Sequence, residues 1–173
     1  MTRRVCSVAL VLASLVSLSC SPAFDVHVSS QATIQSGGLV SELLPADAFP
    51  QFVALDLSQT QDFKNSGIKK SEVKSVELTS LTLKIVSPRG ATFSFLHGIA
   101  FSVETDGQPT REVAHQDSIP ASATSVSLAV DGVELAPYVT APHMTLSTSA
   151  TGVPPSQDTT IEADATFRVV PNL

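Results

Sequence analysis

Short runs in which apolar and polar residues alternate fill most of this chain, and glycine and proline separate them. Alternation with a period of two places apolar side chains on one face of a strand and polar side chains on the other. Helical stretches do not alternate with these runs, so a parallel sheet built from strand–helix–strand units is excluded. The pattern therefore predicts an all-β fold, an antiparallel β-sandwich of about eight strands with one short helix.

The order of the runs also predicts which strands pair. The turn sequence Pro88-Arg89-Gly90 separates residues 73–87 from residues 91–105, so we expect these two strands to form a central hairpin. Residues 144–150 and 159–169 are expected to form a final hairpin. The complete set of expected strands is 24–28, continued at 31–34, then 52–57, 73–87, 91–105, 111–115, 124–130, 144–150 and 159–169.

Irregularities are expected within the central pair of strands. The apolar residues of the first strand change parity at Thr79 and Ser80, which predicts a β-bulge. Gly98 is expected to mark a bend in the second strand. Phe95 and Phe101 share one parity there, so we expect both rings in the core.

The expected helix is defined by its two ends. Ser58 and Gln61 stand three residues apart, as in a capping box, in which each side chain bonds to the other residue's backbone amide. Gly67 can end the helix in a left-handed conformation. We therefore predict a helix over residues 59–66. Single helical turns are expected at 39–44 and 134–139, and the pairs Asp106-Gly107 and Asp131-Gly132 are interpreted as turns.

The first 19 residues have the organisation of a secretion signal and are expected to form a signal helix. Arg3 and Arg4 precede an apolar stretch at 5–18, which is shorter than the about 20 apolar residues of a membrane-spanning helix. This segment ends in Val16-Ser17-Leu18-Ser19-Cys20, which resembles the lipobox of bacterial lipoproteins. The resemblance implies cleavage between Ser19 and Cys20, a diacylglycerol on the Cys20 sulfur, and acylation of the new amino group. The alternative is an ordinary signal peptide with a cysteine at its end by chance.

The cysteine count agrees with lipidation. Cys6 lies in the segment that would be removed, which leaves Cys20 as the only cysteine and excludes an intramolecular disulfide. A single cysteine in an exported protein requires a partner or a modification. The expected organisation is a signal peptide at 1–19, the lipidated cysteine and a tether at 20–23, and a β-sandwich domain at 24–173.

The charge balance excludes one class of partner. Of the 10 basic residues, Arg3 and Arg4 lie in the signal, so residues 20–173 carry 8 basic and 16 acidic residues, a formal charge of −8. A surface with this balance repels polyanions. We therefore expect no nucleic-acid partner.

A second resemblance concerns the mature domain. Residues 73–83, with the sequence VKSVELTSLTL, alternate in the manner of a core strand and are rich in Ser and Thr. This stretch, with the capped helix before it, resembles uncharacterised bacterial lipoproteins with an immunoglobulin-like or late-embryogenesis-abundant-type sandwich. The resemblance implies a fold class and no activity.

Motifs for catalysis are incomplete. Ser66 and Lys69, and again Ser71 and Lys74, match a serine–x–x–lysine spacing, but the Ser-Asp-Asn and Lys-Thr-Gly motifs that accompany it in penicillin-binding folds are absent. A Gly-x-Ser-x-Gly nucleophile elbow is also absent. We therefore interpret the two matches as a polar helix end and the approach to a strand, and we expect no catalytic residue and no enzyme activity.

The sequence predicts no metal or cofactor. Its four histidines, which have no short ligand spacing, are His27, His97, His115 and His143. The chain has no Trp and one Tyr, which disfavours an aromatic platform for sugars.

These features together predict a lipid-anchored protein of the cell envelope with a structural or scaffolding role. Ser21 follows the cysteine, and the sorting rule of enteric lipoproteins then implies the outer membrane. The alternative is a binding module, an adhesin or a subunit of an envelope complex, that uses a sheet edge or the loops after Ser87, Thr105 and Gly152. The expected partners are the membrane, through acyl chains on Cys20, and a protein of the envelope.

Overall fold

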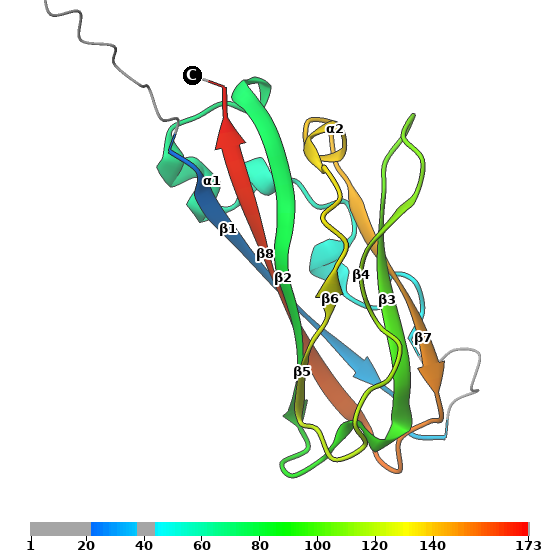
Figure 1. Ribbon diagram of the computed structural model, residues 1–173. Helices are drawn as coiled ribbons and strands as arrows, with labels where there is room; N and C mark the ends of the chain where they lie inside the picture. The colour runs from blue at the N-terminus through cyan, green and yellow to red at the C-terminus, as the bar shows by residue number, and fades with distance from the viewer. Residues whose placement is uncertain (1–21, 38–43, 173) are drawn as a thin grey trace, which may run out of the picture.

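A computed structural model describes residues 22–37 and 44–172. The chain forms two four-stranded antiparallel sheets packed face to face, which confirms the predicted sandwich (Figure 1). The first sheet has the order β1–β8–β2–β5, with bounds Phe24–Ile34, Thr159–Pro171, Val73–Ser87 and Ser125–Ser127. The second has the order β6–β4–β3–β7, with bounds Ala129–Val130, Arg111–Gln116, Leu96–Glu104 and Thr145–Gly152. The signal segment with Cys20 and most of the helical turn expected at 39–44 lie outside the described residues.

Strand β8 is the centre of the first sheet. It pairs with β1 from Phe24 opposite Val169 to Ile34 opposite Thr159, and with β2 on its other side. Alternate residues of β8 are buried along its whole length, as the period-two pattern requires. The single strand β1 also covers both of the segments expected at 24–28 and 31–34.

Both predicted hairpins are wrong. Strands β2 and β3 lie in different sheets, and so do β7 and β8. The connection from Ser87 to Leu96 is long enough to cross between the sheets, and it includes a 3-10 helix, Phe93–Phe95, whose phenylalanines are buried. Alternation specifies which face of a strand is apolar but not which strand is its neighbour, so the sequence pattern could not distinguish a hairpin from this crossing.

The predicted irregularities in these strands are confirmed. The pairing of β2 with β8 shifts register between Leu78 and Ser80, at the predicted bulge. The pairing of β3 with β7 shifts between Leu96 and Gly98. A Cβ atom on Gly98 would lie 3.1 Å from the Gln116 carbonyl oxygen, so the close approach of the backbone favours glycine there.

The segment expected as a strand at 52–57 has a different conformation. It contains parts of two 3-10 helices, Pro50–Phe52 and Leu57–Gln59, and Leu55 makes an isolated bridge to Met144. Proline at the start of the first helix cannot donate a ladder hydrogen bond, which disfavours a strand. The segment lies along the side of the sandwich between β1 and β7, where backbone bonds join Leu55 to Met144, and the Thr148 amide bonds to the carbonyl of Ala46 earlier in the chain.

The strand expected at 124–130 is divided between the two sheets. Its first part is β5 and its last part is β6, and Leu128 lies between them with its amide bonded to the Leu81 carbonyl. The chain therefore crosses from one sheet to the other along the second side of the sandwich. On this side the edge strands of the two sheets, β5 and β6, have only three and two residues, which limits edge-to-edge association with other chains there.

Helix α1, Gln61–Ser66, is shorter than predicted. Its N-cap is Thr60, whose Oγ1 accepts a hydrogen bond from the Phe63 amide, so the expected capping box at Ser58 is wrong. The Asp56 carboxylate accepts the Ser58 amide instead and caps the preceding 3-10 helix. Gly67 ends α1 with φ 71°, as predicted. The expected turn at 134–139 forms a second short helix, α2, Ala136–Val139.

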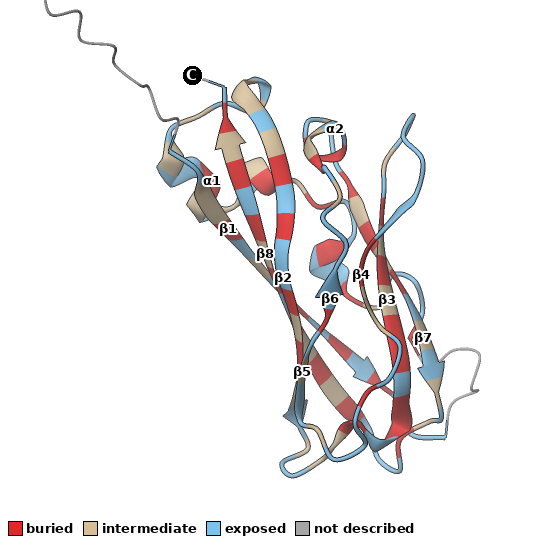
Figure 2. Cartoon of the chain, in the orientation of Figure 1, coloured by how far each residue is buried: buried red, intermediate tan, exposed pale blue. Residues whose placement is uncertain are grey.

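The core lies between the two sheets (Figure 2). Phe101 is fully buried, and its ring centroid lies 5.7 Å from that of Phe49 and 6.1 Å from that of Phe52. Phe95 is also buried, so the prediction for both phenylalanines is confirmed. Two of the three clustered rings come from the segment that closes one side, and this segment is therefore part of the core.

Candidate functional site

One group of side chains on the second sheet brings together atoms that can bind a cation. Glu112 and His115 lie on β4, and Asp131 directly follows β6. One ligand atom of each lies within 4.8 Å of the other two. Within residues 22–37 and 44–172, no other group of three or more histidine, cysteine or carboxylate side chains meets this condition.

A β-bulge turns Glu112 toward His115. In a regular strand, residues three apart point to opposite faces. In the pairing of β4 with β3, Phe101 lies opposite Ala114 and Ser102 lies opposite Glu112, so Val113 is an extra residue. Val113 and Ala114 are both buried, although they are consecutive. The bulge restores Glu112 to the side of the sheet on which His115 lies.

Backbone pairing positions Asp131. His115 lies opposite Ala129 in the ladder between β4 and β6, and the Asp131 amide donates a 3.0 Å hydrogen bond to the Val113 carbonyl. Gly132 follows with φ 62°, a left-handed conformation that favours glycine. The turn expected at Asp131-Gly132 is not formed, because residues 131–133 continue from β6 without a turn or bend.

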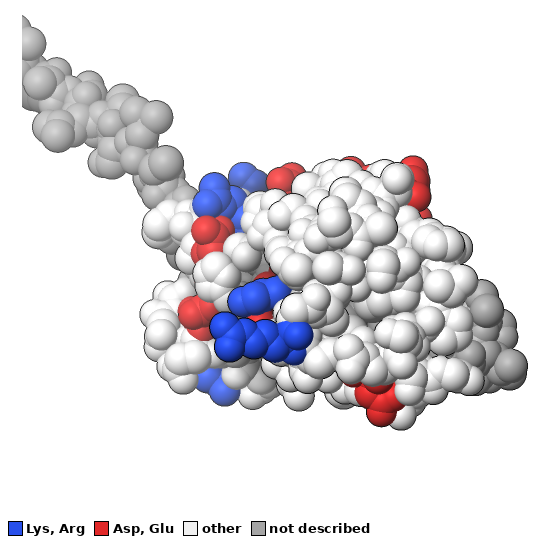
Figure 3. All heavy atoms as spheres, turned by 90° about the horizontal axis from the view of Figure 1, so that it is seen from below, with Lys and Arg blue, Asp and Glu red and all other residues white. Residues whose placement is uncertain are grey.

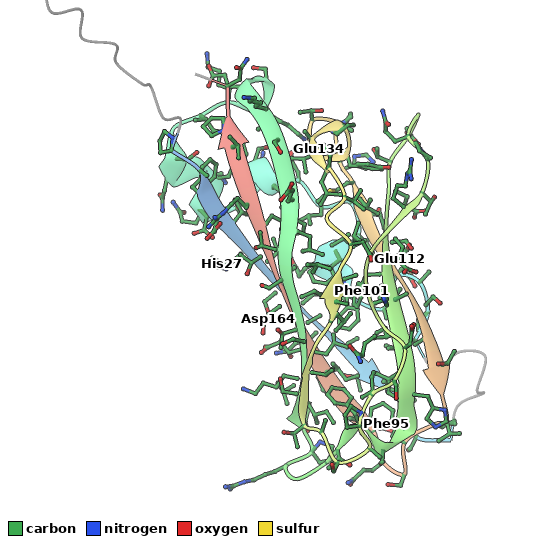
Figure 4. The ribbon with its side chains drawn as sticks, viewed as in Figure 1. His27, Phe95, Phe101, Glu112, Glu134 and Asp164 are labelled. Atoms are coloured by element: carbon green, nitrogen blue, oxygen red, sulfur yellow. The ribbon has the colours of Figure 1, made fainter. Side chains whose placement is uncertain are left out.

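The imidazole of His115 lies between the two carboxylates. Its Nδ1 is 3.3 Å from Glu112 Oε1 and 3.3 Å from Asp131 Oδ1. The side chains of Glu112, His115 and Asp131 are 52%, 33% and 29% exposed, so the carboxylates border solvent. Nδ1 itself is buried and forms no hydrogen bond with any described residue. Figure 4 shows Glu112 beside β4, on the second sheet.

A shallow hollow of about 210 Å³ adjoins this group and crosses β3 toward β7. Its polar lining includes Glu112 and His115 together with Asp117, Ser149 and Thr151. The imidazole and carboxylates can therefore hold a proton or a metal ion at a position that solvent can reach.

Sequence reasoning did not find this group. His115 stood among four histidines without metal spacing, and Asp131 was assigned only to a turn. The sequence feature that could have indicated the group is the spacing Glu112-x-x-His115. On a regular strand, however, residues three apart point to opposite faces of the sheet, so this spacing does not predict a shared site. The pair of consecutive apolar residues at Val113 and Ala114 is the feature that marks the bulge.

The remaining histidines are not grouped with carboxylates in this way. His27 Nδ1 lies 3.2 Å from Thr166 Oγ1 across the pairing of β1 with β8. His97 is exposed on β3. His143 is also exposed. Among the described residues, none of these three histidines belongs to a group of three ligand side chains.

The two serine–x–x–lysine matches have structural positions. Ser66 Oγ donates a 2.6 Å hydrogen bond to the Phe63 carbonyl at the end of α1, as expected for a polar helix end. Ser71 lies in a 3-10 helix, Lys70–Glu72, immediately before β2, and Lys74 lies on β2. In the described part of the chain, neither serine forms a hydrogen bond with the lysine of its own match.

The start of the folded domain is firmly held. Cys20 and Ser19, the predicted lipidation and cleavage residues, lie outside the described residues. Phe24, the first residue of β1, packs its ring edge against Phe63 of α1, with centroids 5.8 Å apart. Asp25 accepts hydrogen bonds from Nε and Nη2 of Arg168 at 2.9 and 3.2 Å. Strand β1 therefore begins four residues after Cys20 in the sequence.

The loops expected as binding elements border two surface hollows. One hollow, of about 300 Å³, lies between residues 90–95 and 153–159, and includes Phe95, Val153 and Gln157. The other, of about 290 Å³, lies beside the loop after Thr105. Figure 1 shows that the loops after Ser87 and Gly152 lie at the end of the sandwich opposite the start of β1.

No protein-family model matches this chain, and no curated protein matches it at a significant level. In the described residues, no helix has the length and apolar composition needed to cross a membrane.

Proposed function

We propose that this chain is a lipoprotein of the cell envelope, attached to a membrane by acyl chains on Cys20, and that its sandwich has a structural or scaffolding role rather than an enzymatic one. The observation that carries the proposal is the distance in sequence between the lipobox-like cysteine and the folded domain. Strand β1 begins at Phe24, so three residues separate the cysteine from the sheet. A chain of this length spans about 10–15 Å at most. The domain then lies against the bilayer.

Acylation would provide durable attachment. Each buried methylene contributes about 0.8 kcal/mol, and a single myristoyl chain binds a membrane only reversibly. A lipobox implies two or three acyl chains on one residue, and together these chains bind a membrane much more durably than a single chain. The proposed membrane is the outer one, because Ser21 rather than aspartate follows the cysteine.

The tether also orients the domain. The start of β1, the end of β8 and helix α1 lie together at one end of the sandwich (Figure 1). This end would face the bilayer, and the loops at 88–95 and 153–158 would face away from it. The pairing of Asp25 with Arg168 fixes β1 to the central strand, so a pull on the tether is transmitted to the sheet rather than to a loop.

A structural role is supported by the closed architecture. The core between the sheets is filled by phenylalanine and aliphatic side chains, and chain segments cover both sides of the sandwich. The hollows described above lie at the surface between loops and strands.

A binding role is the second candidate, and the hollow between residues 90–95 and 153–159 favours it. It lies at the end that would face away from the membrane, and Val153 on its rim is 46% exposed. Figure 3 views the molecule from this end and shows charges of both signs among large uncharged areas. A partner at this end would be a protein of the envelope that contacts mainly uncharged side chains.

The lipid attachment is tested by cell fractionation of two cysteine variants. Cys20→Ser is expected to lose incorporation of labelled palmitate and to leave the protein unprocessed or released from the membrane. Cys6→Ser is the matched control, because it removes the other cysteine from the segment that would be discarded. Equal palmitate incorporation in Cys20→Ser and the wild type would contradict the proposal.

A further inference from the structure

We propose that Glu112, His115 and Asp131 form a binding site for one divalent cation of the zinc class on the edge of the second sheet. The site is independent of the lipid anchor and adds a ligand-binding property to the proposed structural role. The proposed ligand atoms are His115 Nδ1 and the two carboxylate oxygens beside it, Glu112 Oε1 and Asp131 Oδ1.

The spacing of these atoms matches tetrahedral coordination. Zinc binds histidine nitrogen and carboxylate oxygen at about 2.0–2.2 Å, and the edge of a tetrahedron of that radius is about 3.3–3.6 Å. Nδ1 lies 3.3 Å from each of the two oxygens. Two of the three ligand–ligand edges therefore already have the required length. For the third, one oxygen of Glu112 and one oxygen of Asp131 lie within 4.8 Å of each other, and rotation of a carboxylate that borders solvent would shorten this edge.

The buried nitrogen requires a partner. Nδ1 is shielded from solvent, has no hydrogen bond within the described residues, and has two carboxylate oxygens beside it. An unpaired lone pair facing negative charge is unfavourable, and a buried polar atom without a partner is costly. A proton on Nδ1 would remove the repulsion but would form a hydrogen bond to neither oxygen in the observed geometry. A cation between the three atoms satisfies all of them.

The backbone holds two of the ligands in place before any ion binds. His115 and Asp131 are on adjacent paired strands, joined by the bond between the Asp131 amide and the Val113 carbonyl. Glu112 is the most exposed ligand and can close onto the ion last. Three protein ligands leave a further coordination position, which the adjoining hollow makes accessible to water.

The ligand set predicts selectivity. One imidazole and two carboxylates suit borderline cations such as Zn²⁺, whereas Ca²⁺ requires six to eight oxygen ligands and Mg²⁺ retains its waters. The two carboxylates also balance the charge of a divalent ion.

The test is equilibrium dialysis of the full-length protein with Zn²⁺ alone, combined with titration calorimetry. We expect one zinc ion per chain to be lost, or its affinity to fall at least about tenfold, in His115→Ala, Glu112→Gln and Asp131→Asn. The matched control is His97→Ala, which removes an exposed histidine from the same sheet and is expected to leave binding unchanged. Mg²⁺ is expected to compete poorly.

Because Cys6 and Cys20 can also bind zinc, the decisive quantity is the difference in stoichiometry or affinity between each variant and the wild type. Zinc binding that is the same in Glu112→Gln, His115→Ala and the wild type would overturn the proposal, as would a wild type that binds no zinc. If thermal melting shows His115→Ala to be unfolded, the exposed Glu112→Gln variant decides the outcome. The palmitate experiment on Cys20 does not affect the zinc measurements. The proposal of lipid attachment and the proposal of a cation site can therefore fail independently.

Discussion

Asp25 on β1 lies opposite Arg168 on the neighbouring strand β8, and the side chains of the two residues form two hydrogen bonds, at 2.9 and 3.2 Å. Asp25 is the second residue of β1, and Arg168 lies on the central strand β8. The pair fastens the start of the folded domain to a strand that is itself paired on both sides. Both side chains border solvent, so its contribution is to the position of β1 more than to overall stability.

This pair predicts a measurable change in ionisation. The hydrogen bond from Arg168 lowers the pKa of Asp25 below its ordinary value of 3.8. In Arg168→Gln, the pKa of Asp25 is expected to rise toward that value, which carbon NMR of the carboxyl group can measure. Lys84→Gln is the control, because it removes a cation from the same sheet at a different position in the ladder. An unchanged pKa in Arg168→Gln would show that the pair does not form in solution.

Glu134 predicts a pH-dependent stability. Partial burial opposes ionisation, but hydrogen bonds from Ser75 Oγ and from the backbone amides of Val76 and Ala136 outweigh it and lower the pKa below 4.5. The stabilisation is therefore present at neutral pH and is lost as the pH falls through the lowered pKa. Glu134→Gln is expected to reduce the free energy of unfolding by roughly 1 kcal/mol at pH 7, with allowance for solvent screening.

Urea denaturation at pH 7 and at pH 3 measures this effect. The difference between Glu134→Gln and the wild type should shrink at the lower pH, because the stabilisation by the ionised carboxylate is progressively lost as the pH falls from the ordinary pKa of 4.5 toward the lowered one. Glu104→Gln, on β3, is the control and is expected to differ little at either pH. A difference that stays constant with pH would exclude an ionised Glu134 as the cause. Figure 4 shows Glu134 beside α2.

Phe101 predicts a large loss of stability. Its ring is fully buried and contacts the rings of Phe49 and Phe52, which close one side of the sandwich. Phe101→Ala is expected to lower the free energy of unfolding by about 3–5 kcal/mol, as measured by chemical denaturation. Phe24→Ala provides the comparison, since Phe24 is only half-buried and should cost less. Similar losses for both would mean that the three-ring cluster is not the centre of the core.

Gly98 predicts a steric penalty. An added Cβ would lie 3.1 to 3.2 Å from the carbonyl oxygens of Gln116 and Asp117 and from Thr151 Oγ1. The backbone must shift to accept it, and Gly98→Ala is expected to destabilise the protein by about 1–3 kcal/mol. Thermal unfolding measures the change, and a melting temperature equal to that of the wild type would show that strand β3 has room at this bend.

The sequence predicted the fold class because alternation reports burial directly. The change of parity at Thr79 and Ser80 marked a real bulge, and the parity of Phe95 and Phe101 marked real core positions. The pairing of strands could not be predicted in the same way. Residues 88–95 contain turn residues whether the chain reverses within a sheet or crosses to the other one, and only packing of Phe93 and Phe95 between the sheets distinguishes the two.

The cation-binding group was hidden for a related reason. Its geometry depends on Val113 being an extra residue in β4 and on Ala129 lying opposite His115, and neither relationship is local in sequence. Asp131 is 16 residues from His115 along the chain and reaches it only through the ladder between β4 and β6. The lipobox-like segment, by contrast, can be identified from its own residues, since its chemistry depends only on their order.

Lipid attachment at Cys20 is tested most directly by the mass of the mature amino terminus, measured on protein extracted from cell membranes. We expect an amino-terminal peptide that begins at Cys20 and carries a diacylglycerol on sulfur and an acyl chain on nitrogen. A water-soluble protein whose Cys20 has a free thiol, or whose first residue is a different one, would contradict it.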